Sequence, residues 1–180
     1  APGYAAAVRL GLEPGADHEL VLGPSRGLET RVVDEQGRPV PGALVTAVPV
    51  ALARFVETTS AADGSIRLEG LGDAPLYLAA SAPGFLPAGL PLLHPANAPA
   101  RLVLPRPRTL EGVVREGSSP ARGAALRLYA EHLAHTAVAA DGTFRIEGLY
   151  PGEWSLSASL GRRSASGEVQ LDAPVTRVEL

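Results

Sequence analysis

The 180-residue sequence contains no cysteine, no methionine and no lysine. The lack of cysteine excludes disulfide bonds, thiolate nucleophiles and thiolate-bound zinc together. All 16 basic residues are arginine, so no side-chain amine is present to act as a nucleophile. Because methionine is absent, the sequence has no start residue of its own. We therefore expect a segment of a longer protein, with any targeting signal outside it.

Aromatic side chains and long apolar runs are also scarce. Aromatic residues make up 4% of the sequence, although its hydrophobic content of 46% is ordinary. No stretch of about 18 consecutive apolar residues could span a membrane. The net charge is −3 and the arginines are scattered along the chain. We therefore expect neither membrane insertion of this segment nor a nucleic acid partner.

One stretch of the sequence occurs twice. Residues 61–71 are AADGSIRLEGL and residues 139–149 are AADGTFRIEGL, with eight of eleven positions identical. Apolar and charged residues alternate within the stretch, which predicts a strand with one buried face. The Asp-Gly pair before it favours a tight turn. A repeat at this spacing predicts two small domains of similar architecture.

The rest of each repeat also alternates between apolar and polar residues, with turn signals every 8–12 residues. This pattern predicts an all-β chain of two tandem seven-stranded antiparallel Greek-key β-sandwiches, over residues 27–106 and 107–180. Residues 1–26 look like the end of an earlier unit, because Glu19–Leu22 follows the pattern of Arg101–Leu104. We expect them to form the closing hairpin of a preceding repeat plus a short Pro-containing linker.

The alternation also predicts which side chains face the cores. The expected inward set is Val32, Val45, Ile66, Leu68, Leu71, Leu76 and Leu78 in the first repeat, with Val114, Leu126, Leu128, Phe144, Ile146, Leu149, Trp154 and Leu156 in the second.

A longer pattern runs through both copies: LxGxVxDxxGxPxxGAxV, then AxDGxFxLxGLxxGxYxLxxxAPGY, then a strand pair ending in leucine. Residues 28–45 and 61–85 carry it in the first repeat, and residues 110–126 and 139–158 in the second. The pattern resembles the carboxypeptidase regulatory-like domain family. That resemblance implies a transthyretin-like sandwich without catalytic activity, used as an accessory, spacer or adhesive unit of larger, mostly exported proteins.

Several related activities can be tested against the residues. Similar repeats of collagen-binding adhesins often form an isopeptide bond from a lysine, which this chain lacks. Related hydroxyisourate hydrolases use a His/Arg cluster and a Tyr-Arg-Gly-Ser tail, whereas this sequence ends Arg-Val-Glu-Leu. Glycan-binding sandwiches stack sugars on exposed aromatic rings, for which Tyr77, Tyr129 and Tyr150 are the candidates. We favour the interpretation that they are three ordinary half-buried tyrosines.

The sequence gives little evidence for a metal site or a catalytic group. His132 and His135 are three residues apart, so on a strand they would face opposite sides and could share zinc only in a loop. Asp63 and Asp141 each stand alone beside a glycine, without the several oxygen ligands that calcium takes, so we interpret them as turn residues. No Ser-His-Asp spacing, carboxylate pair or phosphate-binding loop occurs. We expect no cofactor, no metal and no enzymatic activity.

The repeats differ most at one corner. Where the first has Ala82–Phe85, the second has Leu160–Arg163. We therefore expect Arg162 and Arg163, which could pair with an anionic partner, and the tyrosines Tyr77 and Tyr129 as candidate partner-binding residues. The sequence predicts a structural, spacer or adhesion-type segment of a larger exported bacterial-type protein, in contact with neighbouring domains of the same polypeptide. The alternative is a carbohydrate- or protein-binding module, and either role implies an extracytoplasmic location.

Overall fold

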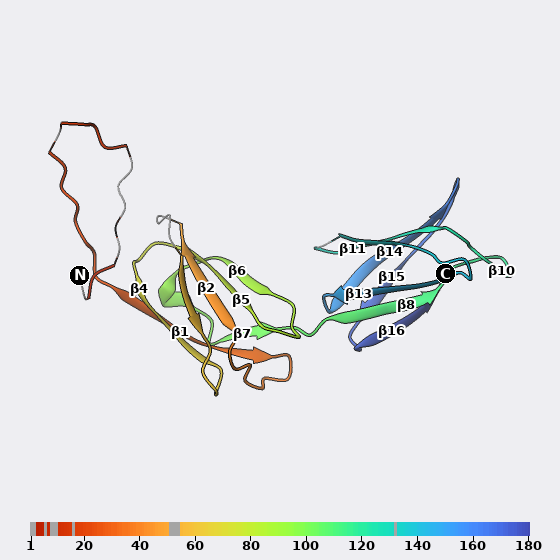
Figure 1. Cartoon of the computed structure of the whole chain (residues 1–180), viewed down its shortest axis with the longest axis horizontal. Coiled ribbons are helices and arrows are strands. Elements are labelled where there is room, and N and C mark those ends of the chain that lie inside the picture. Colours follow the sequence, from red (N-terminus) through yellow and green to blue (C-terminus); the bar gives the residue numbers. More distant parts are fainter. Residues whose placement is uncertain (1–2, 6, 8–10, 16, 51–54, 132) are drawn as a thin grey trace. The chain divides into compact units, whose positions relative to one another are not determined.

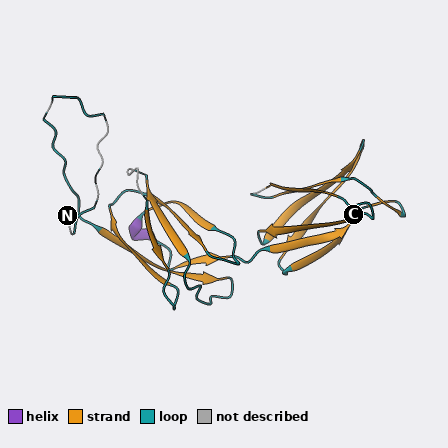
Figure 2. Cartoon of the chain, viewed as in Figure 1, coloured by secondary structure: helices purple, strands orange, loops and turns teal. Residues whose placement is uncertain are grey.

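The structure is a computed structural model, which describes residues 3–5, 7, 11–15, 17–50, 55–131 and 133–180. Strands dominate these residues, and the one helical element among them is a 3-10 turn at Pro95–Asn97 (Figure 2). The chain divides into two compact units, unit 1 over residues 1–105 and unit 2 over residues 106–180. The prediction of an all-β fold is confirmed.

Unit 1 is a sandwich of two sheets (Figure 1). In its described residues, one sheet has the order β4-β1-β7 and the other the order β3-β2-β5-β6. The strands are β1 (Arg26–Asp34), β2 (Leu44–Pro49), β3 (Val56–Thr59), β4 (Ser65–Leu71), β5 (Leu76–Ser81), β6 (Ala88–Leu93) and β7 (Arg101–Leu104).

Unit 2 repeats this arrangement. Its described residues form one sheet with the order β13-β8-β16 and another with the order β12-β11-β14-β15, while the short strands β9 and β10 pair with each other. The strands are β8 (Arg108–Val113), β9 (Arg115–Glu116), β10 (Ser119–Pro120), β11 (Ala125–Tyr129), β12 (Leu133–Ala137), β13 (Thr143–Leu149), β14 (Gly152–Leu160), β15 (Arg163–Leu171) and β16 (Val175–Glu179).

Each unit has its own hydrophobic core between its two sheets. Strand β5 shows why the sequence folds in this way, since every second residue from Leu76 onward is buried and the residues between are exposed. All fifteen side chains of the expected inward set are buried. The Asp-Gly turns also form as predicted, because the carboxylates of Asp63 and Asp141 accept hydrogen bonds from Ser65 and Thr143 in their own turns.

The first and last strands of each unit pair in parallel. β1 lies beside β7, and β8 lies beside β16, each in the same direction, whereas the other ladders of the described residues are antiparallel. The expectation of sheets that are antiparallel throughout is therefore corrected at this pair. Alternation predicts which residues face inward, but it carries no information on the direction of a partner more than 60 residues away.

Residues 3–5 pair with residues 23–25 ahead of β1. Tyr4 and Pro24 form an isolated antiparallel bridge, and the backbone N–H of Ala5 donates to the Gly23 carbonyl. Residues 19–22 are not part of a strand, although one was expected there, and Leu20, Val21 and Leu22 are exposed. The assignment of residues 1–26 to an earlier repeat stays a prediction.

Candidate partner-binding sites

The diverged corner of unit 2 is a tight hairpin. β14 ends at Leu160 and β15 begins at Arg163, which lie opposite each other, so only Gly161 and Arg162 form the turn. Gly161 has a φ of 59°, which a two-residue hairpin requires at its first central position and which glycine adopts without strain. In unit 1 the equivalent corner is longer, because residues 82–87 separate β5 from β6.

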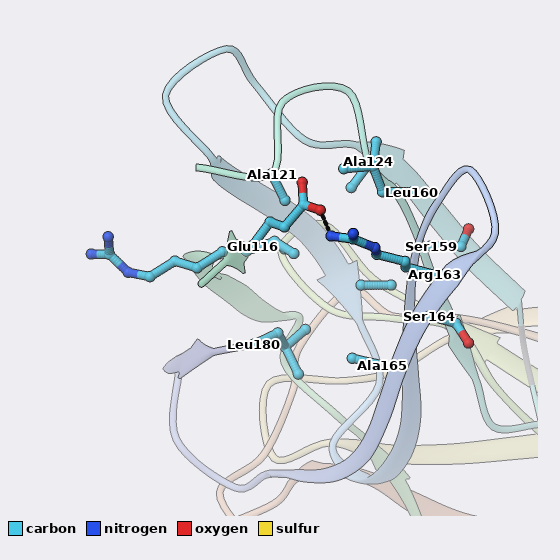
Figure 3. A pocket seen from close by; sticks show the side chains of 12 residues that line it. Glu116, Ala121, Ala124, Ser159, Leu160, Arg163, Ser164, Ala165 and Leu180 are labelled. Atoms are coloured by element: carbon cyan, nitrogen blue, oxygen red, sulfur yellow. Dashed lines mark ion pairs between the residues drawn. The ribbon is translucent and has the colours of Figure 1, made fainter. Parts of the chain in front are cut away.

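This hairpin forms one side of a pocket of about 180 Å³, here called the corner pocket. Figure 3 shows Arg163 reaching across its mouth to Glu116, with which it forms an ion pair. The pocket is apolar inside and carries charge only at its rim. Its lining residues are Val114, Arg115, Glu116, Ala121, Ala124, Ala158, Ser159, Leu160, Arg163, Ser164, Ala165 and Leu180.

In unit 1 the equivalent space is filled by larger side chains. The position of Ala121 is taken by Val40, since each donates its backbone N–H to the matching residue of the first strand. Leu104 at the end of β7 is fully buried, and Phe85 of the diverged corner packs against the core. Unit 2 therefore has a smaller side chain, Ala121, at the position that Val40 takes in unit 1.

The structure thus places one of the two candidate arginines at a cavity. Arg163 lines the corner pocket, whereas Arg162 is exposed in the turn and is not a lining residue. The expected difference between the repeats is located at this corner, but the cavity is also lined by Ala121, which the sequence comparison did not single out.

Tyr77 lies on the outer face of the four-stranded sheet of unit 1. It is opposite Val48. Phe55 comes just before β3, next to the pair of Ala47 and Val56, and Leu92 lies in β6 between the partners of Leu76 and Leu78. Phe55 and Leu92 are the most exposed members, at 62% and 59%. Leu92 sits at a bulge in the ladder with a φ of 45°, unusual for a residue with a side chain. We call these four residues the apolar row.

Tyr129 lies in the corresponding row of unit 2, but on the strand β11, which is the counterpart of β2 and not of β5. It is opposite Leu133 on one side and Ser155 on the other, so it takes the place of Val48, while Ser155 takes the place of Tyr77. The two candidate tyrosines therefore lie on separate units, at positions of the row that are not equivalent. Sequence reasoning missed Phe55 and Leu92, because only the register across four strands aligns them with Tyr77.

The described residues contain no group of three or more His, Asp or Glu side chains that could hold a metal ion. His135 is exposed on β12, and His132 lies outside the described residues, so the zinc alternative is not placed. The carboxylates of Asp63 and Asp141 are engaged within their turns. Hydrogen bonds from the side chain and backbone of Ser65 or Thr143 lower the pKa of each.

Two further carboxylates are held by arginines. Glu111 on β8 accepts hydrogen bonds from Arg177 at 2.7 Å and from Arg145 at 2.5 Å, and the bond from Arg177 is the main reason that the pKa of Glu111 is lowered. Asp34 at the end of β1 is bound by the side chain and backbone of Arg38. These contacts link neighbouring strands and turn residues and assemble no reactive group.

The fold and these sites can now be compared with known proteins. Residues 27–104 match the family of carboxypeptidase regulatory-like domains. This segment is the sandwich of unit 1, so the predicted resemblance is confirmed there. Unit 2 repeats the same strand order and the same Asp-Gly motif. A comparison with curated protein sequences finds no match. Among the described residues, no helix has the length and apolar character needed to cross a lipid bilayer.

Solved structures with a related arrangement include pilins. A streptococcal ancillary pilin shares 14% identity over 89% of this chain and 64% of its own, with a TM-score of 0.44. GBS52, a minor pilin of Streptococcus agalactiae, shares 14% identity over 85% and 94%, with a TM-score of 0.44. The TIE protein of Bacillus anthracis shares 13% identity over 87% and 33%, with a TM-score of 0.37. The chain spans less than two thirds of the ancillary pilin and of the TIE protein.

Proposed function

We propose that this chain is a non-catalytic structural or adhesion-type segment that spaces other domains within a larger exported protein. In this proposal residues 27–106 and 107–180 are the two repeats, residues 1–26 close an earlier one, and the location is extracytoplasmic. The observation that carries the spacer role is the parallel pairing of the first and last strands in each unit.

The parallel pair allows each unit to be connected end to end with further domains. Because β1 and β7 are neighbours running in the same direction, the chain enters unit 1 at one end of the sandwich and leaves at the other. The same holds for β8 and β16 in unit 2. A nine-residue strand such as β1 extends about 30 Å. Each repeat therefore adds roughly one strand length between the segments that flank it.

The same pairing supports a role in resisting tension along the chain. Tension on the two ends of a unit pulls β1 and β7 past each other, so their backbone hydrogen bonds are loaded together instead of one after another. Single-molecule pulling on the chain ends tests this. We expect two discrete unfolding events, each releasing about 230 Å of chain, since about 75 residues extend by roughly 3.5 Å each and the folded length of about 30 Å is subtracted.

The direction of pulling provides the control. Arg26 and Asp73 lie at the same end of the β1–β4 pair and form an ion pair. Because the chain has no cysteine, Arg26→Cys and Asp73→Cys give unique attachment points. Pulling there peels the strands apart, and we expect a clearly lower unfolding force. Equal forces in both directions, or no discrete events from the chain ends, would contradict the spacer proposal.

A second candidate function, binding of a glycan or another protein, is favoured by the apolar row. Its exposed side chains lie together on one sheet face, and aromatic residues are enriched in recognition surfaces. A screen against glycans and surface proteins should then yield a ligand whose affinity falls at least about tenfold with Tyr77→Ala or Leu92→Ala. Leu44→Ala, which removes an exposed apolar side chain elsewhere on the same sheet face, is the matched control. Equal loss in the control would exclude this site.

A further inference from the structure

The outer face of the four-stranded sheet of unit 2 carries two basic side chains next to each other. Arg127 of β11 lies opposite His135 of β12 on one side and opposite Ser157 of β14 on the other. Both basic residues are exposed. Residues directly opposite each other on one sheet face have Cβ atoms about 4.5–5.5 Å apart, so a single ligand group can contact both. We call Arg127 and His135 the basic pair.

The basic pair is not neutralised within the described part of unit 2. No described residue forms an ion pair or a side-chain hydrogen bond with either member of the pair. On the other sheet of the unit, by contrast, Arg145 and Arg177 both bind Glu111. On the face of the basic pair, Glu168 lies two strands away from Arg127 and in the neighbouring row, opposite Ser155. The guanidinium of Arg127 is therefore available to an anion from outside the unit.

Unit 1 has a different pair at the same place. Because Tyr129 takes the place of Val48, Arg127 takes the place of Thr46, and His135 takes the place of Glu57. The Thr46 hydroxyl donates a hydrogen bond to the Glu57 carboxylate at 3.1 Å. The fold thus accepts a hydroxyl and a carboxylate that satisfy each other at this place, so the sheet itself does not require the basic pair.

The side chains around the basic pair are an aromatic ring and hydroxyl groups. Tyr129 lies in the next row of β11 and is 44% exposed. A depression of about 510 Å³ is lined by Tyr129, Ser155, Ser157 and Ser166 among others, and Ser157 lies opposite Ser166. Strands β11 and β14 are interior strands of the sheet, so their backbone groups are taken up by the ladders on both sides. A ligand on this face therefore meets side chains and not free backbone groups of these strands.

We propose that this face of unit 2 binds a polysaccharide that carries carboxylate groups, such as a polymer of uronic acids. Arg127 binds the carboxylate through two parallel hydrogen bonds, and His135 donates a further one from its ring. The Tyr129 ring packs against a sugar ring, and the serine hydroxyls exchange hydrogen bonds with sugar hydroxyls, since both donate and accept. An acidic peptide fits less well, because extended peptides gain affinity mainly from backbone pairing at a strand edge, and Arg127 and Tyr129 lie on an interior strand.

The inference goes beyond the spacer role and does not depend on it, since pulling experiments need no ligand. It also differs from the binding function of the apolar row, which lies on unit 1, so Tyr77→Ala should leave it unchanged. Because the depression is exposed to solvent and the contacts are polar, we expect a Kd of about 0.1–1 mM for a short oligosaccharide.

An NMR titration of the full chain tests the class of ligand. The probe is a galacturonic acid oligomer, and we expect saturable shifts of the Arg127, His135 and Ser157 amides at millimolar probe. The same oligomer with its carboxylates methyl-esterified is the matched ligand and should bind at least about tenfold more weakly. A polyglutamate peptide of equal charge tests the other class of anion. Absence of saturable shifts, equal affinity for the esterified oligomer, or equally tight binding of the peptide overturns the proposal.

Exchange of the basic pair tests the site. Arg127→Thr combined with His135→Glu introduces the pair that the same fold carries in unit 1, so unit 2 should keep its Tm while its affinity for the oligomer falls at least about tenfold. Arg177→Glu, on the outer face of the other sheet, changes the net charge by the same amount when histidine is neutral and should leave the affinity within about twofold. An equal loss in this control, or unchanged affinity after the exchange, overturns the proposed site.

Discussion

At the residue scale, the repeated Asp-Gly turn shows how backbone conformation and packing combine. Gly142 has a φ of 86°, and a Cβ there would lie 2.8 Å from Pro120 Cβ and 2.9 Å from the Val114 carbonyl oxygen. Gly148 has a similar φ of 75°, but a Cβ there would meet nothing within 4 Å. Comparing substitutions at Gly142 and Gly148 therefore separates the free-energy cost of a left-handed backbone from that of a steric clash.

We expect Gly148→Ala to lower the free energy of unfolding of unit 2 by about 1 kcal/mol, because only backbone strain is introduced. Gly142→Ala should lower it by at least about 1 kcal/mol more, since the added methyl group also displaces Pro120 or the Val114 backbone. Urea denaturation of both variants measures the difference. Equal destabilisation would show that this turn is not packed against Pro120 as described.

The buried carboxylate of Asp34 makes unit 1 sensitive to acid. Burial alone would raise the pKa of Asp34, but hydrogen bonds from the Arg38 side chain and from the backbone N–H groups of Arg38 and Gln36 lower it. The folded-state pKa thus lies below the unfolded value of about 3.9. The resulting stability is fully present above that pH and is lost as the pH falls through the folded-state pKa.

Asp34→Asn should therefore destabilise unit 1 at neutral pH, and the difference from the native chain should shrink at about pH 2.5. Denaturant titrations of both proteins at the two pH values measure this. Glu153→Gln, at an exposed position of unit 2, controls for the loss of one negative charge. A difference that stays constant with pH would mean that the ionised form of Asp34 is not what these hydrogen bonds stabilise.

At the element scale, the strands and their buried faces follow from local pattern. Alternation within β4, β5 and β13 identifies the inward residues, because neighbouring side chains of a strand point to opposite faces. The parallel β1–β7 pair and the apolar row do not follow, since both depend on the register between distant strands. The corner pocket is predictable from the sequence only in part. Comparison of the repeats locates it near Leu160, but it is also lined by Ala121, which comes from a different part of the chain.

Two facing residues of unit 2 differ in size from their counterparts in unit 1, one being larger and the other smaller. Where unit 1 has Thr30 opposite Ile66, unit 2 has Gly112 opposite Phe144. A Cβ on Gly112 would lie 3.0 Å from two carbons of the Phe144 ring and would clash with the Val178 carbonyl oxygen. The larger ring of Phe144 is thus accommodated by the missing side chain of Gly112.

We expect Gly112→Thr alone to cost about 1–3 kcal/mol through overpacking, and Phe144→Ile alone to cost about 1 kcal/mol or more through the cavity it leaves. The double variant should be less destabilised than the sum, with a coupling of at least about 0.5 kcal/mol. A double-mutant cycle from urea denaturation gives this value. Additive effects would show that the two positions adapted separately.

At the scale of the whole molecule, the two units have separate hydrophobic cores. The core of unit 1 draws on residues 28–104 and that of unit 2 on residues 110–171, and neither includes a residue of the other. The short segment Pro105-Arg106-Pro107 connects β7 to β8. Because a domain's cooperativity comes from its own packed core, the chain should not unfold in one all-or-none transition.

Replacing Leu126 with alanine creates a cavity in unit 2 alone and should cost about 2–5 kcal/mol there. Calorimetry of the full chain should then show one transition moved to lower temperature and one unchanged. Leu78→Ala, at a buried position in the core of unit 1, should move the other transition instead. If either substitution lowers both transitions equally, the cores are energetically coupled, and a unit could not unfold under load while its neighbour stays folded.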